Sequence, residues 1–121
     1  MERKNDNSTA GLLKWRGRSV EIAVGETFQL PCESPHGGCT IKFTFSVHQD
    51  LTASFSILQA GQVLHSEDAT RQTGEVTVTD AGMCSICWAN THSFEWNGLL
   101  APRSVTYEVF GPHPLHARAC A

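Results

Sequence analysis

The sequence contains no long apolar run. No segment approaches the roughly 18 to 20 consecutive apolar residues that a helix needs to cross a bilayer. Residues 1–7 are polar and charged, and only the short stretch 10–13 precedes the next charge. Neither a membrane-spanning helix nor a secretory leader is therefore indicated. We expect a cytoplasmic protein.

The sequence also lacks an excess of positive charge. Its nine Lys and Arg residues are outnumbered by twelve Asp and Glu residues, which gives a formal net charge of −3. A nucleic-acid-binding domain normally carries a clearly basic face. Nucleic acid is therefore not an expected partner.

Helical periodicity is missing as well, because no segment of ten or more residues repeats its apolar positions every 3.6 residues. Alternation with a period of two is common, most clearly from Ile41 to Val47 and again from Leu51 to Ile57. Strands are expected at 20–24, 28–32, 41–47, 51–57, 63–65, 75–79, 84–89 and 105–109, with a polar loop at 66–73.

Short strands separated by turn signals are typical of two packed sheets. We therefore predict an all-β chain that folds as a two-sheet antiparallel β-sandwich, with a jelly-roll or immunoglobulin-like architecture. The predicted organisation is a flexible N-terminal lead at 1–18, a sandwich at 19–110 and a C-terminal tail at 111–121. Within the lead, Trp15 stands among basic residues, and a weak attraction to anionic lipid is the alternative to a solvated segment.

Catalytic motifs are absent too. The sequence contains no G-x-S-x-G, no glycine-rich phosphate loop and no dinucleotide fingerprint. Cys39 near His36, and Ser93 beside His92, are the nearest approaches to a nucleophile with a base, but neighbours on a strand usually point apart. We expect no enzyme and no cofactor.

Cysteine is present in an odd number, five, so the thiols cannot all pair. Cys84 and Cys87 form a C-x-x-C that suggests zinc, but a spacing of three along a strand directs the two sulfurs to opposite faces. We therefore expect reduced thiols, an exposed Cys120 and no metal.

The segment 92–102 is unusually apolar for a connection between strands. It contains Phe94, Trp96, Leu99 and Leu100 within a few residues. Such a loop either folds back onto the core or presents an apolar patch to a partner. These four residues are the candidate partner-binding residues.

The segment from Gly82 to Phe94 and the strand that follows it resemble the closing hairpin of the Golgi-dynamics (GOLD) domain family. The resemblance is carried by the corner Trp88-Ala89-Asn90-Thr91-His92-Ser93 and by the strand around Tyr107, and it covers about residues 19–110. Trp88, Asn90, Ser93 and Tyr107 are its structural residues.

Membership of this family would imply a β-sandwich that acts as a non-catalytic protein-interaction module in membrane trafficking or lipid handling. Its partner would be a trafficking or adaptor protein, with peripheral membrane or lipid contact left open, and its location cytoplasmic with association to Golgi or other membranes. Lumenal relatives also suggest a disulfide between Cys32 and Cys87, a pairing that the sequence leaves open.

An extracellular immunoglobulin-like recognition domain is the alternative. The segment 25–32 resembles a B strand, and 80–86 stands where a D-x-G-x-Y-x-C corner would be. Cys84 occupies the tyrosine position and Ile86 the cysteine position, however, and no tryptophan follows Cys32 on the next strand.

Overall fold

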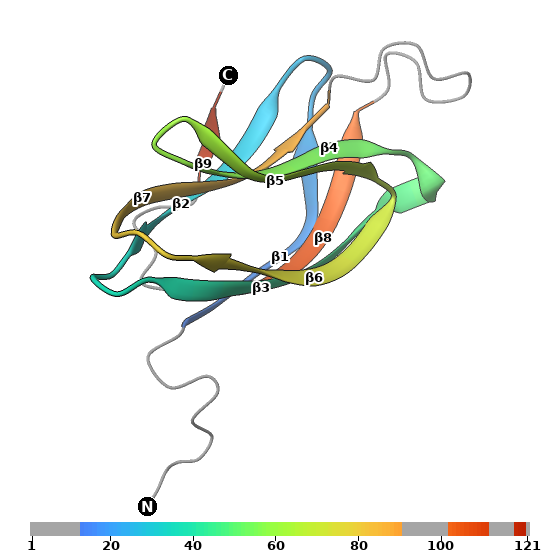
Figure 1. Ribbon diagram of the computed structural model, residues 1–121. Helices are drawn as coiled ribbons and strands as arrows, with labels where there is room; N and C mark the ends of the chain where they lie inside the picture. Colours follow the sequence, from blue (N-terminus) through green and yellow to red (C-terminus); the bar gives the residue numbers. More distant parts are fainter. Residues whose placement is uncertain (1–12, 91–101, 112–117, 121) are drawn as a thin grey trace, which may run out of the picture.

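Two antiparallel sheets pack face to face in the computed structural model of the chain (Figure 1). The structure describes residues 13–90, 102–111 and 118–120, with Leu13 and the last three described by their backbone alone. Within these ranges no helix is long and apolar enough to span a bilayer. The elements are β1 (Leu13–Ile22), β2 (Thr27–Ser34), β3 (Cys39–Val47), the 3₁₀ turn η2 (His48–Asp50), β4 (Ala53–Gln59), β5 (Gln62–Ala69), β6 (Arg71–Val78), β7 (Gly82–Ala89), β8 (Arg103–Gly111) and β9 (Arg118–Cys120).

The strand order identifies the architecture. One sheet has the order β1-β8-β3-β6 and the other the order β5-β4-β7-β2-β9. In the described chain, β4 and β5 are the only consecutive strands that pair, and every other connection crosses to the opposite sheet. This is the order of a jelly roll with one strand added, and it differs from the immunoglobulin order. The predicted all-β, two-sheet antiparallel sandwich is thus confirmed.

The core lies between the two sheets and follows the alternation of the sequence. In β3 the positions from Ile41 to Val47 that were predicted to face inward are buried, and β4 buries Ala53, Phe55 and Ile57 in the same way. The Phe55 ring lies 4.7 Å from the rings of Phe43 and Phe45, centroid to centroid. Aromatic packing across the two sheets therefore fills the centre of the sandwich.

The pairing expected from the resemblance to the closing hairpin is wrong. The strand around Trp88 and the strand around Tyr107 do not form a closing hairpin, because β7 pairs with β2 and β4 whereas β8 pairs with β1 and β3. The consecutive strands β1 and β2 likewise do not pair, since they lie in opposite sheets. Alternation shows which face of a strand is buried, but it does not identify the neighbouring strand.

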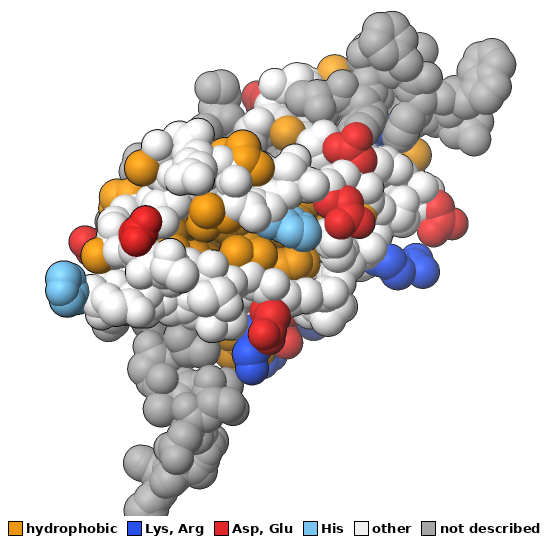
Figure 2. Space-filling model, viewed as in Figure 1, with side chains coloured by type: hydrophobic (Ala, Val, Ile, Leu, Met, Phe, Trp, Pro, Cys, Tyr) orange, Lys and Arg blue, Asp and Glu red, His pale blue; other side chains and the backbone are white. Residues whose placement is uncertain are grey.

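The segment 66–73 is not a polar loop. It contributes the second half of β5 and the beginning of β6, which are edge strands hydrogen-bonded to β4 and β3, respectively. An edge strand needs few apolar residues, which explains the misleading composition. Figure 2 shows apolar side chains along the side of the sandwich where β5 and β6 face each other.

The first strand begins at Leu13, six residues before the predicted start of the sandwich. Its register with β8 shifts between Gly17 and Val20, so two residues oppose one at a β-bulge. Trp15 and Gly17 face inward before the bulge, and Val20 and Ile22 face inward after it. Because the inward-facing residues change from odd to even numbers at the bulge, the sequence of β1 shows no clean alternation. The predicted lead 1–18 thus includes strand residues, and the predicted tail includes β9.

Candidate functional site

The outer face of the β1-β8-β3-β6 sheet collects positive charge. It carries five of the chain's nine Lys and Arg residues, although the whole chain has a net charge of −3. These residues are Lys14, Arg16 and Arg18 on β1, Lys42 on β3 and Arg71 on β6. Each alternates with positions that face the core.

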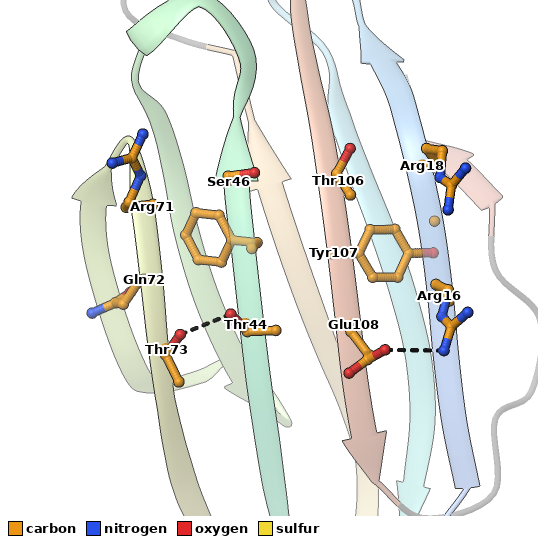
Figure 3. Close-up of a pocket in the computed structure, with 12 residues that line it drawn as sticks. Arg16, Arg18, Thr44, Ser46, Arg71, Gln72, Thr73, Thr106, Tyr107 and Glu108 are labelled. Atoms are coloured by element: carbon orange, nitrogen blue, oxygen red, sulfur yellow. Dashed lines mark hydrogen bonds and ion pairs between the residues drawn. The ribbon is translucent and has the colours of Figure 1, made fainter.

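A groove of about 680 Å³ lies across this face. Figure 3 shows Arg16 and Arg18 on one side of it and Arg71 on the other, with the residues of β8 and β3 between them. Three strand-to-strand spacings separate β1 from β6, or about 14 Å. The lining comprises Arg16, Gly17, Arg18, Thr44, Phe45, Ser46, Arg71, Gln72, Thr73, Thr106, Tyr107 and Glu108.

Strand register places the outward side chains of the groove in two rows. In the first row Arg16 lies opposite Glu108, Glu108 opposite Thr44, and Thr44 opposite Thr73. In the second row Thr106 lies opposite Ser46, and Ser46 opposite Arg71. Residues far apart in the sequence therefore meet on one surface, in a pattern that requires all four strands.

Among the residues that the structure describes, Glu108 is the one carboxylate that lines the groove. One of its oxygens lies 3.0 Å from Lys14 Nζ and 3.2 Å from an Arg16 guanidinium nitrogen. The hydrogen bond from Lys14, followed by the charges of Lys14 and Arg16, lowers the pKa of Glu108. The side chain therefore stays ionised at neutral pH, as a fixed acceptor rather than a group that exchanges a proton.

The hydroxyl groups of the groove are partly held in place by hydrogen bonds. Thr44 Oγ1 lies 2.7 Å from Thr73 Oγ1, and His48 Nε2 lies 2.8 Å from Thr106 Oγ1. The backbone N–H of Ser19, in the bulge of β1, donates to Thr106 Oγ1 at 3.0 Å. The bulge thereby joins the edge strand to the floor of the groove.

Arg18 and Arg71 supply the positive charge that the groove's own carboxylate does not balance. Among the described residues Arg18 has no recorded ion pair. Arg71 lies 3.6 Å from Asp50, and both side chains are largely exposed to solvent. Such a surface pair is weak. Both guanidinium groups are therefore available to an incoming anion.

A second hollow of about 360 Å³ continues the groove along the same face. It shares Thr44, Thr73 and Glu108 with the first and adds the half-buried ring of Phe110. The ammonium group of Lys14 lies 5.4 Å from the centroid of that ring. This end of the face therefore combines an aromatic surface with a cation that covers it.

Trp88 and Tyr107 lie in the core between the sheets. Their rings are stacked, with centroids 4.9 Å apart and an interplanar angle of 29°. Burial raises the pKa of the Tyr107 hydroxyl. The side chains of β7 and β8 thus meet across the core, although the two strands do not pair.

Asn90 holds the connection between β1 and β2 against the end of β7. Its side-chain amide donates to the carbonyl of Ile22 at 2.9 Å, and its backbone N–H donates to the carbonyl of Glu26 at 2.9 Å. Its own carbonyl accepts a hydrogen bond from the backbone N–H of Gly25 at 2.8 Å. The buried Asn90 therefore has a structural role in the fold.

The predicted partner-binding residues lie outside the described residues. This holds for Phe94, Trp96, Leu99 and Leu100, and equally for Ser93 and His92. The binding role of the 92–102 segment stays a prediction, as does the exposure of the Cys120 side chain.

The arrangement of the cysteines excludes the disulfide that the GOLD resemblance suggested. Cys32 lies opposite Cys84 in the β2 and β7 register, whereas Cys87 lies opposite Gln29. An offset of three residues is about 10 Å along a strand, too far for a disulfide between Cys32 and Cys87. Cys32, Cys84 and Cys87 form no disulfide among the described residues. No cluster suited to a metal occurs among the residues described.

Cys39 and His36, weighed above as a nucleophile and its base, have different surroundings. Its sulfur contacts the hydroxyl of Ser34 at 3.6 Å, whereas His36 is exposed to solvent. Cys39 and His36 are close together in the sequence, but the Cys39 thiol makes its polar contact with the hydroxyl of Ser34.

Sequence reasoning missed the groove residues. Arg16 and Arg18 were assigned to a flexible lead and Arg71 to a polar loop, so their common surface could not be recognised. One signal was present in the alternation of Lys14, Arg16 and Arg18 with Trp15 and Gly17, which is the pattern of a strand with one basic face.

Comparisons with known proteins identify the fold but no family. No protein-family model matches the sequence, and no curated protein matches it. Among solved structures, the chain is similar to the CBM36-1 domain, a carbohydrate-binding module, of a multidomain xylanase from the hindgut metagenome of Trinervitermes trinervoides. The TM-score is 0.50 and the sequence identity 11%, over 88% of this chain and 95% of that one. At this identity the similarity shows a shared β-sandwich fold.

Proposed function

We propose that this protein is a non-catalytic recognition module that binds an anionic group in the groove on its β1-β8-β3-β6 sheet. The observation that carries the proposal is the lining of the groove. Three arginines face one carboxylate there, so the groove has a net charge of +2 in a chain whose overall charge is negative. Basic side chains on opposite sides of a groove attract and orient an anion.

The chemistry of the lining supports binding rather than turnover. The carboxylate of Glu108 is ion-paired with two cations, and its lowered pKa makes it a poor general acid. The neighbouring groups are hydroxyls and guanidinium groups, which hold a ligand by hydrogen bonds without exchanging protons near pH 7. A sandwich of the kind found in a carbohydrate-binding module is consistent with this role.

The biological setting that we propose is membrane traffic. The support is the sequence resemblance of the Trp88 to Ser93 corner to GOLD domains, together with the buried positions of Trp88 and Asn90. In this proposal the module works in the cytoplasm at Golgi or other membranes. Its protein partner is a trafficking or adaptor protein that contacts the 92–102 segment.

An affinity pull-down from cell extract tests this function with two variants. Arg18→Glu combined with Arg71→Glu reverses the charge of the groove, and Phe94→Ala combined with Trp96→Ala removes aromatic rings from the 92–102 segment. We expect each variant to lose part of the set of captured proteins identified by mass spectrometry. An unchanged set for both variants, with both still folded by circular dichroism, would refute the proposal.

Neutral carbohydrate recognition is a second candidate, favoured by the half-buried Phe110 ring beside the groove and by the shared fold. Sugars commonly stack on exposed aromatic rings. Here, however, the Lys14 ammonium already lies over the Phe110 ring, and the groove is charged. A glycan-binding assay with neutral oligosaccharides separates this candidate from the first.

A further inference from the structure

The arrangement of charge in the groove narrows the choice of ligand. Arg16 and Arg18 belong to β1 and Arg71 to β6, on opposite sides of the sheet. The backbones of these strands are about 14 Å apart. Each arginine can extend several ångströms over the floor, so a ligand of single-ring size can contact both sides. A lone carboxylate is too small to do so, whereas a ring with an anionic group at each end has the required span.

The type of cation favours phosphate. The planar guanidinium presents several N–H donors in a fixed fork, which matches two oxygens of a phosphate group. All three basic side chains that line the groove are arginines, because Lys14 and Lys42 lie beyond its lining. The groove is thus suited to groups that accept paired hydrogen bonds.

The floor between the arginines favours a polyol. Ser46, Thr44 and Thr106 offer side-chain hydroxyls, and two of these are oriented by bonds to Thr73 and His48. The backbone amides of β3 and β8 are engaged in the sheet, so an extended acidic peptide would find no main-chain partners on this floor. A ring that carries both hydroxyl and phosphate groups would have a partner for each.

From these features we infer that the groove binds a phosphorylated polyol of the inositol phosphate class. Its phosphates contact Arg18 and Arg71, with Arg16 as a further donor, and its free hydroxyls contact the hydroxyl floor. This inference rests on the proposed function, because it names the anionic group that the groove recognises. The same chemistry occurs in soluble inositol phosphates and in phosphoinositide headgroups of membranes.

Isothermal titration calorimetry with inositol hexakisphosphate at physiological ionic strength tests the inference. We expect saturable binding with one ligand per chain and no binding of unphosphorylated myo-inositol. Arg18→Gln combined with Arg71→Gln should weaken binding by at least about tenfold, since two charge-assisted contacts are lost. Unaltered affinity in this variant would overturn the assignment.

A charge-compensated variant distinguishes binding by the groove residues from long-range attraction by the net charge of the protein. Adding Glu33→Gln and Asp80→Asn to the double arginine variant restores the original net charge at two exposed positions outside the groove. Affinity should stay low in this fourfold variant. Recovery of the original affinity would show that long-range attraction, rather than the groove, binds the phosphate.

The direction in which Glu108→Gln changes the affinity provides another test. Removing the one carboxylate that lines the groove should tighten the binding of inositol hexakisphosphate by several-fold, because a like charge is lost. A neutral sugar in the same groove would instead exchange a charged acceptor for the weaker amide oxygen and bind more weakly. Weaker binding of the phosphorylated probe by this variant would contradict the inference.

Two further binding measurements distinguish a membrane lipid headgroup from a soluble inositol phosphate as the ligand. Binding to phosphatidylcholine vesicles that contain phosphatidylinositol bisphosphate, measured by sedimentation, would assign the ligand to the membrane. Binding of the soluble probe alone would assign it to the cytosol. If neither probe bound, the inference would be overturned. It would also be overturned if hexaglutamate, an acidic peptide, bound more tightly than inositol hexakisphosphate and did so through Arg18 and Arg71. If the pull-down above still depended on the groove, the proposed function would survive that failure.

Discussion

Cys32 and Cys84 show how burial controls chemistry at single residues. They face each other across β2 and β7, and both are buried. Burial, followed by the neighbouring thiols Cys84 and Cys39, raises the pKa of Cys32 to about 12. Burial also raises the pKa of Cys84. The reactive thiolate is therefore scarce at both positions in the folded protein.

We predict that Cys32 and Cys84 resist alkylation in the native protein. At pH 8 a thiol with a pKa of about 12 is ionised roughly two thousandfold less than an ordinary thiol with a pKa of about 8.5. Iodoacetamide labelling followed by peptide mass spectrometry should therefore modify the half-buried Cys39 before Cys32 and Cys84 in the native protein, and should modify all three of these residues in denaturant.

The pH dependence of this effect has a definite sign. A thiol whose pKa is raised by folding stabilises the native state below its unfolded pKa, and this contribution is lost as pH rises toward the folded value. Stability should therefore fall as pH rises above the ordinary thiol pKa of about 8.5. Native labelling of Cys32 or Cys84 at the denatured rate, at pH 8, would contradict the buried arrangement.

At the level of elements, β1 depends on a close approach between two strands. A Cβ atom added at Gly17 would lie 2.3 Å from Cε2 of Tyr107, far inside van der Waals contact. Glycine is therefore required where the strand crosses the buried ring. The next two residues form the bulge, after which β1 buries Val20 and Ile22.

Gly17→Val should therefore destabilise the protein by about 1–3 kcal/mol or more, because the new side chain overpacks the Tyr107 ring. Glu21→Val introduces the same residue into the same strand at an exposed position, and should change stability by less than about 0.5 kcal/mol. Chemical denaturation of both variants measures the difference. Equal stabilities would show that residues 13–18 are not part of the sheet, as the sequence had first indicated.

The sequence predicted the strands better than their partners. In β3 and β4, alternation from Ile41 to Ile57 identified the buried face because side chains alternate strictly in a regular strand. It failed in β1, where the bulge reverses the alternation, and in the second half of β5, where an exposed edge needs few apolar residues. Partner choice depends on contacts between distant segments, which no local pattern records.

For the whole molecule, the main feature is the separation of charge that the fold creates. The sequence has a modest negative charge and no basic cluster apart from residues 14–18. The jelly-roll order brings β1 and β6 to opposite edges of one sheet, so that their arginines line a common groove. Fold class was predictable from local pattern, but this site was not, because it exists only after four strands assemble in register.

The central claim is that this outer face is the recognition surface of the protein. An amide ¹H–¹⁵N chemical-shift map during titration with inositol hexakisphosphate tests it most directly. The account predicts that the largest shifts cluster at 16–18, 44–46, 71–73 and 106–108, on the four strands that line the groove. Shifts confined to β4, β5 and β7, or spread evenly over the described strands, would contradict it.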